Sequence, residues 1–298
     1  MNPRGTLIRV KKFQVDEKPG NLSLAIIDRR QMVQSALAVL ASNEALAAPA
    51  HAPTVAVIGR SHIAALAASA TEGKKAAYGF LNTSKFEPIA KPGQVTEIAD
   101  PLRSELLTLT AEAKLAGLLI GGNQHIAQSL FRRTPPIEVV LSDYPDLPLT
   151  EGYQLVPERL FLEFFERTQA DLKSVLAFLR AERPQIKLVV MGAPPPIADA
   201  SFILERLDPI LREFIAKNGI SAEPSSVAPA VFRWKVWHLL NRTFRDAAKA
   251  YDAEWLLPPA STFDDTGRFL AREFWGTDAT HANASYGDHR FRQLEAFL

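Results

Sequence analysis

Short apolar runs and longer amphipathic stretches alternate along most of this chain. The runs are rich in Val, Ile and Leu, a composition typical of strands buried on both faces of a sheet. They predict strands over 54–58, 76–80, 118–120, 137–141, 186–191 and 254–257. The stretches between them carry apolar side chains at helical spacing. They predict helices over 62–69, 106–115, 157–183, 202–217, 230–251 and 283–297.

Strands that alternate with helices imply a parallel sheet with helices on both of its faces. The predicted fold class is therefore α/β, a three-layer α/β/α sandwich with a parallel sheet of flavodoxin-like or Rossmann-like type. In such sheets ligands bind outside the carboxyl ends of the strands. Polar residues that directly follow the apolar runs are thus the candidates for chemistry.

The first fifty residues lack this alternation and predict a separate N-terminal extension. We expect a short strand over 7–15 and an amphipathic helix over 29–47. Pro53 lies at the end of this region, where proline is typical of a boundary. The expected organisation is an extension over 1–50 followed by a catalytic domain over 51–298.

Composition and charge narrow the function classes. The chain has 298 residues, with 34 Lys and Arg, 33 Asp and Glu, and a formal net charge of +1. This balance produces no strong field, so we expect neither nucleic acid nor a membrane as a partner. Cysteine is absent, which excludes disulfides, cysteine zinc sites and a cysteine nucleophile.

Three observations predict a cytoplasmic location. The absence of cysteine fits a reducing compartment. No run approaches the roughly 20 apolar residues that a membrane span needs. The first twenty residues also lack the apolar core of a signal peptide.

Polar residues with a shared chemistry follow the predicted strands. Gly59-Arg60-Ser61 follows the first run, Gly121-Gly122-Asn123 follows the third, and Asp278 and His281 lie near the C-terminus. A serine hydroxyl becomes a good nucleophile when a base takes its proton, and a histidine oriented by a carboxylate is such a base. The backbone N–H of Ser61, at the start of a helix, and the Asn123 amide can both stabilise an oxyanion.

These three segments, in this order, resemble the signature blocks of the SGNH (GDSL-like) hydrolases. Gly59-Arg60-Ser61 is similar to the nucleophile block, and Gly121-Gly122-Asn123 to the block whose asparagine binds the oxyanion. Asp278-x-x-His281 is similar to the closing block that supplies the acid and the base. The resemblance implies a catalytic triad of Ser61, Asp278 and His281. It also implies an oxyanion hole formed by Ser61, Asn123 and a glycine, for which Gly79 is the candidate by order.

The sequence departs from the family pattern at Arg60, where the family more often has Asp. That Asp is not the triad acid, so the implied chemistry is unaffected. Arg60 either favours an anionic substrate or pairs with a local carboxylate. His62 and His125 flank the expected site, and we interpret both as structural groups rather than catalysts.

The resemblance implies a serine hydrolase, an esterase or carbohydrate O-deacetylase that acts through an acyl-serine. The expected partner is a small-molecule or carbohydrate ester, and neither a metal nor an organic cofactor is implied. One alternative is an O-acyltransferase that uses the same triad on a glycan. Another is a non-catalytic carbohydrate- or partner-binding module that retains the same residues as relics. Taken singly, Ser61 and Asn123 could each also be a helix cap. A hydrogen bond between Ser61 Oγ and His281 Nε2 would favour the catalytic interpretations.

Overall fold

A computed structural model describes residues 53–72, 77–86, 88–91 and 93–298. Within these residues the central sheet has five parallel strands in the order β2-β1-β3-β6-β7. The strands are β1 (Val55–Gly59), β2 (Tyr78–Asn82), β3 (Leu115–Leu119), β6 (Lys187–Met191) and β7 (Glu254–Leu256). When the strands of this sheet alone are renumbered along the chain, their order is 2-1-3-4-5, which is the order of a flavodoxin-like fold. The predicted fold class is confirmed.

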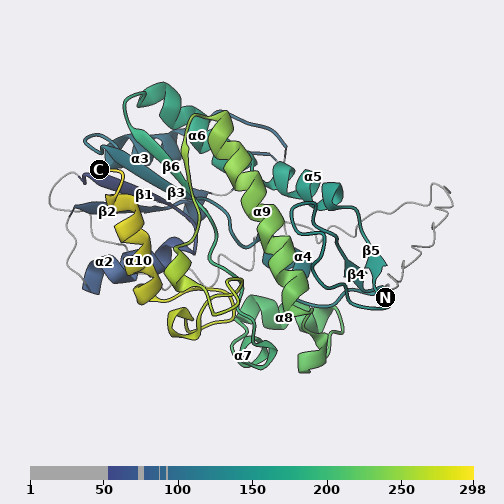
Figure 1. The fold of residues 1–298 in the computed structure, drawn as a ribbon. Helices are drawn as coiled ribbons and strands as arrows, with labels where there is room; N and C mark the ends of the chain where they lie inside the picture. The colour runs from purple at the N-terminus through teal and green to yellow at the C-terminus, as the bar shows by residue number, and fades with distance from the viewer. Residues whose placement is uncertain (1–52, 73–76, 87, 92) are drawn as a thin grey trace, which may run out of the picture.

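Successive side chains of each strand point to opposite faces, and both faces are buried. Ala56 and Ile58 lie in a core with α3 (Asp100–Leu109), α6 (Ala170–Glu182) and α9 (Ala230–Ala250). Val55 and Val57 face α2 (Ile63–Glu72) and α10 (Ala284–Glu295) on the other side. Figure 1 shows α2 and α10 together, with the long α9 across the opposite side. These are the three layers of the sandwich.

Two of the predicted helices are each broken in the structure. The helix expected over 157–183 is α5 (Glu158–Thr168) followed by α6, and the break falls at Gln169. Gln169 is fully buried, and its Nε2 donates to Thr243 Oγ1 of α9 at 3.3 Å. This tertiary contact leaves no trace in the local pattern.

The second break has a local cause. The helix expected over 202–217 is α7 (Ala200–Glu205) followed by α8 (Pro209–Lys217). Asp208 caps α8 by accepting from Leu211 N at 2.8 Å, and Pro209 occupies the first turn. Asp followed by Pro is a start signal for a new helix.

Two further predictions were wrong in position. The helix expected over 106–115 is α3, which begins at Asp100 with a proline in its first turn. Residues 115–119 are instead the central strand β3. The run at 137–141 contributes only β4 (Ile137–Glu138), which pairs with β5 (Gln154–Leu155) outside the central sheet.

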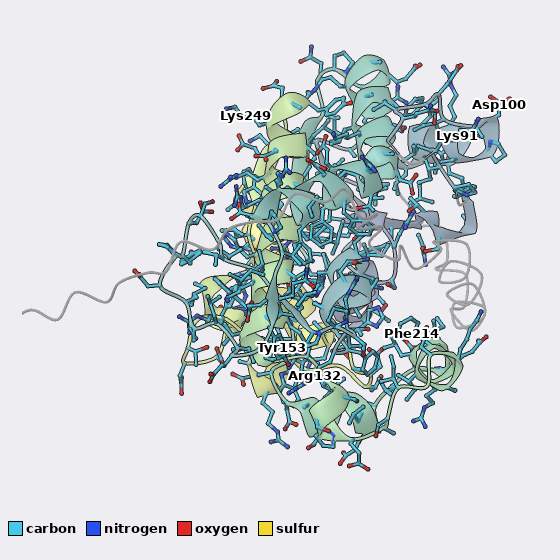
Figure 2. All side chains as sticks on the ribbon, turned by 90° about the vertical axis from the view of Figure 1, so that its right-hand side faces the viewer. Lys91, Asp100, Arg132, Tyr153, Phe214 and Lys249 are labelled. Atoms are coloured by element: carbon cyan, nitrogen blue, oxygen red, sulfur yellow. The ribbon has the colours of Figure 1, made fainter. Side chains whose placement is uncertain are left out.

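The chain around β4 and β5 is anchored to the body of the molecule. Lys235 Nζ of α9 donates to Glu138 Oε1 at 3.1 Å, and both side chains are fully buried. Burial of such a pair is tolerated because each charge has its partner. At the same end, the Arg132 guanidinium carbon lies 5.9 Å from the ring centre of Tyr153 (Figure 2).

The strand over 7–15, the helix over 29–47 and the extension over 1–50 fall outside the described residues. Among the helices that the structure describes, none is both long and apolar enough to cross a membrane.

Candidate active site

Ser61 follows β1 in a tight turn that leads into α2. The turn requires glycine at position 59, where a Cβ would lie 2.4 Å from Ile63 Cγ2 and 2.5 Å from Leu119 O. Thr83 Oγ1, just after β2, donates to Gly59 O at 3.1 Å and fixes the turn from the other side. Ser61 is half-buried at the carboxyl edge of the sheet.

Asn123 reaches Ser61 from the loop that follows β3. Gly121 and Gly122 both have φ of +114°, a backbone conformation that L side chains rarely adopt. Asn123 is exposed, and its Nδ2 donates to Ser61 Oγ at 3.4 Å. Asn123 immediately precedes α4 (Gln124–Ser129), yet its side chain makes no capping hydrogen bond there. The amide is therefore directed to the nucleophile rather than to the helix.

Asp278 and His281 form a closed pair in the loop before α10. His281 Nδ1 lies 2.8 Å from Asp278 Oδ2, and Asp278 Oδ1 accepts from the backbone N–H groups of Thr280 at 2.8 Å and His281 at 2.9 Å. Burial alone would raise the pKa of Asp278, but the hydrogen bond from His281 and these N–H donors outweigh it and hold this pKa below its ordinary value. An ionised Asp278 assigns the hydrogen of neutral His281 to Nδ1 and leaves the Nε2 lone pair for a proton.

The predicted hydrogen bond between Ser61 Oγ and His281 Nε2 is absent from this structure. His281 Nε2 is buried and has no hydrogen-bond partner among the described residues. Catalytic hydrogen bonds are often long without substrate and tighten in the reacting complex. Of the two ring nitrogens of His281, Nδ1 is paired with Asp278 and Nε2 is not.

Helices α2 and α10 bring the serine and histidine loops together. Their backbones touch, because a Cβ at Gly287 of α10 would lie 2.2 Å from Ala65 O of α2. Ser69 Oγ adds a hydrogen bond of 2.6 Å to Asp288 Oδ1 between the same helices. Ser61 lies in the turn just before α2 and His281 in the loop just before α10, so this contact brings the two loops close to each other.

Two buried histidines surround these residues. The His62 ring lies 5.0 Å from the His281 ring, centre to centre, and His125 Nδ1 lies 2.6 Å from Gly122 O. Burial is the main cause that lowers the pKa of His62 to about 3, assisted by the nearby His281. Burial likewise lowers the pKa of His125 to about 4. Both rings are therefore neutral at pH 7.

Arg60 is engaged in an ion pair. Its guanidinium donates to Asp171 Oδ2 of α6, and the other oxygen of Asp171 accepts from Ala90 N at 2.7 Å. Asp171 is buried. Of the two alternatives for Arg60, the structure supports pairing with a local carboxylate.

Gly79 does not reach the site, which corrects the prediction that it completes the oxyanion hole. It pairs with Ala56 near the amino end of the sheet, well before the turn that carries Ser61. A Cβ there would lie 2.6 Å from both Leu109 Cδ1 and Pro53 Cγ, so its small size serves packing. The residue of β2 that stands opposite Gly59 is Asn82.

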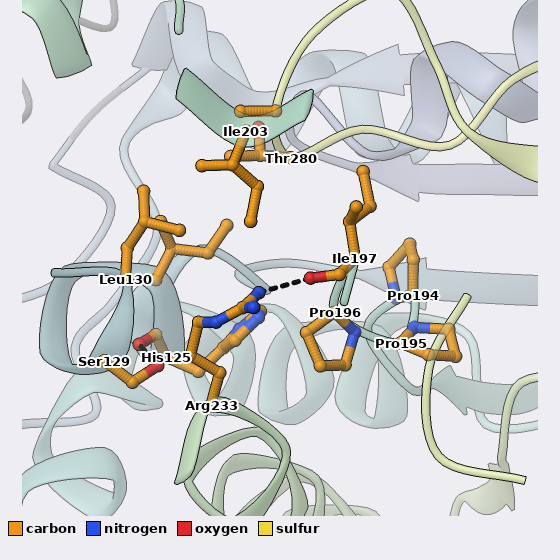
Figure 3. Close-up of a pocket in the computed structure, with 12 residues that line it drawn as sticks. His125, Ser129, Leu130, Pro194, Pro195, Pro196, Ile197, Ile203, Arg233 and Thr280 are labelled. Carbon is orange, nitrogen blue, oxygen red and sulfur yellow. Dashed lines mark hydrogen bonds between the residues drawn. The ribbon is translucent and has the colours of Figure 1, made fainter. Parts of the chain in front are cut away.

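A small cavity of about 20 Å³ adjoins the site, with Thr280 and His125 in its wall. This volume holds little more than one water molecule. The buried Arg233 guanidinium donates to Ile197 O (Figure 3) and, at 2.8 Å, to Ala198 O. It thereby fixes the proline-rich wall over 194–197. This arginine is not among the residues predicted for the site, and its one signal in the sequence is a charge among the apolar positions of α9.

The sequence matches no family model. It also matches no curated protein.

Several solved structures are similar at low identity. A GDSL-like lipase from Bacteroides thetaiotaomicron is 13% identical, with 90% of this chain and 99% of that chain covered and a TM-score of 0.42. A phospholipase A1 from Streptomyces albidoflavus is 15% identical over 83% of this chain and 99% of that chain, with a TM-score of 0.42. A carbohydrate acetylesterase from Sinorhizobium meliloti is 14% identical over 83% and 100%, with a TM-score of 0.38. Likenesses at this level carry no argument about the reaction, which depends on the geometry described above.

Proposed function

We propose that this chain is a serine hydrolase of the SGNH (GDSL-like) type that cleaves carboxylic esters through an acyl-serine intermediate. Two neighbouring arrangements carry the proposal. Asn123 donates to Ser61 Oγ, and the His281 ring of the Asp278–His281 pair lies 5.0 Å from the ring of His62, the residue after Ser61. A nucleophile, an oxyanion donor and an oriented base are the three parts that acyl transfer requires.

In the acylation step, Ser61 Oγ attacks the ester carbonyl carbon and its proton passes to His281 Nε2. The carbonyl oxygen becomes an oxyanion, which accepts from Asn123 Nδ2 and the Ser61 backbone N–H. Asp278 remains ionised and stabilises the imidazolium of His281. When the intermediate collapses, the C–O bond to the alcohol breaks and His281 returns the proton to the leaving alcohol.

In the deacylation step, water takes the place of the alcohol. His281 Nε2 accepts a proton as the water oxygen attacks the acyl carbon, and the same oxyanion donors act again. The bond to Ser61 Oγ then breaks and His281 reprotonates the serine. The acid product leaves and the site returns to its starting state.

The proposed substrate is a small carboxylic ester or an O-acetylated carbohydrate. Arg60 has no part in recognising it, because its guanidinium pairs with Asp171. The ester would enter beside the exposed Asn123 and the half-buried Ser61.

Hydrolysis of p-nitrophenyl acetate by the wild type and Ser61→Ala tests the proposal. We expect the variant to fall to the uncatalysed rate, a loss of roughly 10³-fold or more, because the nucleophile is removed. Ser104→Ala, an exposed serine of α3, is the matched control and should keep full activity.

A fluorophosphonate probe on the wild type separates the alternatives. Covalent labelling of Ser61 together with hydrolysis supports the proposal. Labelling without hydrolysis of any ester favours transfer of the acyl group to a glycan hydroxyl. Neither labelling nor hydrolysis contradicts the proposal and favours a binding module.

A further inference from the structure

His62 contacts each of the segments that form the candidate site. It is the residue after Ser61, and its ring lies 5.0 Å from the His281 ring at an interplanar angle of 51°. On another side it packs against the asparagine loop, where a Cβ at Gly122 would lie 2.5 Å from His62 Cδ2 and 2.8 Å from its Nε2. One buried side chain thus joins the nucleophile turn, the oxyanion loop and the base.

The His62 ring is buried with few polar contacts. The side chain is only 3% exposed, and neither Nδ1 nor Nε2 forms a hydrogen bond of good geometry with a described residue. The Asn123 amide interacts with the ring and offsets part of the effect of burial on the pKa of His62. Buried polar atoms without partners destabilise a fold, and each such atom in a native structure calls for an explanation. A contribution to folding stability alone does not explain a histidine here.

We propose that His62 is a positioning residue, whose flat ring packs between Gly122 and His281 and keeps the base and the oxyanion loop aligned with Ser61. The inference deepens the proposed esterase function and depends on it. His62 takes no proton and forms no bond in the reaction. His62 acts by holding the His281 ring in position. A displacement of about 1 Å at a reacting group can lower a rate by roughly 10²-fold.

The charges around His62 are consistent with this role. The ionisable groups that interact with it are His281, His125 and the Asp278 carboxylate. Because burial keeps His62 neutral, it places no positive charge beside the imidazolium that His281 becomes during acyl transfer.

Three variants test the role by steady-state hydrolysis of p-nitrophenyl acetate. We expect His62→Ala to lower kcat by about 10–100-fold with KM changed less than about two-fold, because the base is misplaced while the substrate site remains. His62→Phe restores a ring without nitrogens and should recover most of kcat. Thr71→Ala, which removes only a hydrogen bond to Ala67 O within α2, is the matched control and should leave kcat unchanged.

Several outcomes would overturn the inference. Wild-type kcat in His62→Ala would exclude a positioning role, and equal losses in the Phe and Ala variants would assign the role to a ring nitrogen instead. If the Ala variant does not fold, His62→Val replaces it, since it keeps an apolar contact without the ring, and wild-type kcat there has the same meaning. A wild type that neither hydrolyses the ester nor reacts with a fluorophosphonate overturns the proposed function itself, and His62 would then have no base to position.

Discussion

Hydrogen bonding at the candidate site is strongly uneven from one residue to the next. The Asp278 carboxylate accepts from His281 Nδ1, from two backbone N–H groups and, at 3.1 Å, from Thr280 Oγ1. His281 Nε2, at the other side of the same imidazole, has no partner among the described residues. This contrast directs the basic lone pair of His281 away from the carboxylate, which is the orientation that a general base requires.

Replacement of Asp278 by Asn reverses that direction. We expect Asp278→Asn to lower kcat by roughly 10³-fold or more, because the amide NH₂ would make Nδ1 an acceptor and move the imidazole hydrogen to Nε2. The fold should persist, since the remaining oxygen can still accept from the Thr280 and His281 N–H groups. Stopped-flow or steady-state hydrolysis of p-nitrophenyl acetate measures the effect.

A second His–Asp pair supplies the matched control. Asp143 Oδ2 lies 3.2 Å from His238 Nε2 at the surface, outside the candidate site. Asp143→Asn should leave kcat within about two-fold of the wild type. An equal loss in the two variants would show that Asp278 has no special relation to the reaction.

The sequence placed Ser61 and Asn123 just after predicted strands, and Asp278 and His281 near the C-terminus. In the structure Asn123 donates to Ser61, and the Asp278–His281 pair lies beside His62. The sequence pattern could not show how far Gly79 lies from Ser61, because that depends on the register between β1 and β2. In that register Gly79 packs against Leu109 and Pro53, which are distant from it in the chain. The local sequence pattern therefore predicted residues that follow a strand, such as Ser61, better than a residue inside a strand, such as Gly79.

At the scale of elements, the contact between α2 and α10 fixes the site. A single glycine inside a helix weakens the helix, so it often indicates that a neighbour packs closely there. At Gly287 that neighbour is the backbone carbonyl of Ala65. Both helices were predicted from periodicity. Their contact was not, because close approach of two backbones involves no apolar pattern.

A methyl group at Gly287 should separate these helices. We expect Gly287→Ala to destabilise the fold by about 1–3 kcal/mol, as overpacking does, and to lower kcat because Ser61 and His281 move apart. Urea unfolding and ester hydrolysis measure the two effects.

Gly219 is the control for this substitution. It has φ of +61° and nothing within 4 Å of the added Cβ. Gly219→Ala should therefore lower stability through backbone strain while kcat stays unchanged. Equal kcat in the two glycine variants would contradict the idea that the α2–α10 contact sets the catalytic distance.

At the scale of the whole molecule, the alternation of elements was enough to predict the fold class. The order of strands was left open between the flavodoxin-like and Rossmann-like types, since it depends on which side each crossover takes. The helix breaks at Gln169 and Asp208 likewise differ in whether a local sequence signal marks them. Asp208-Pro209 is a local signal that could have been used, whereas Gln169 is defined by its contact with Thr243.

The whole molecule should lose stability in mild acid. The pKa values of His62 and His125 are about 3 and about 4 in the fold, below the value of about 6.5 in an unfolded chain. Between these limits the unfolded chain binds more protons than the native state, so the free energy of unfolding falls as pH falls below 6.5. Each histidine contributes about 1.4 kcal/mol per pH unit in this window.

Urea unfolding at pH 7 and pH 5 measures this slope. His62→Phe removes one of the two titrating rings, so its stability should fall less steeply than that of the wild type, by about one proton per molecule. Ser104→Ala, at the exposed serine of α3, removes no titrating group and should keep the wild-type slope. The same slope in all three proteins would contradict the assignment of the acid effect to the buried histidines.

Under the proposed function, the packing of Gly287 against Ala65 also links reactivity to the synthesis of the chain. Ser61 and α2 leave the ribosome early, whereas His281 and α10 follow after most of the chain. In the proposed reaction, a nascent chain without α10 would carry Ser61 without His281 and would not attack an ester. Reactivity would then begin only when α10 docks on α2, which ties it to folding through this helix.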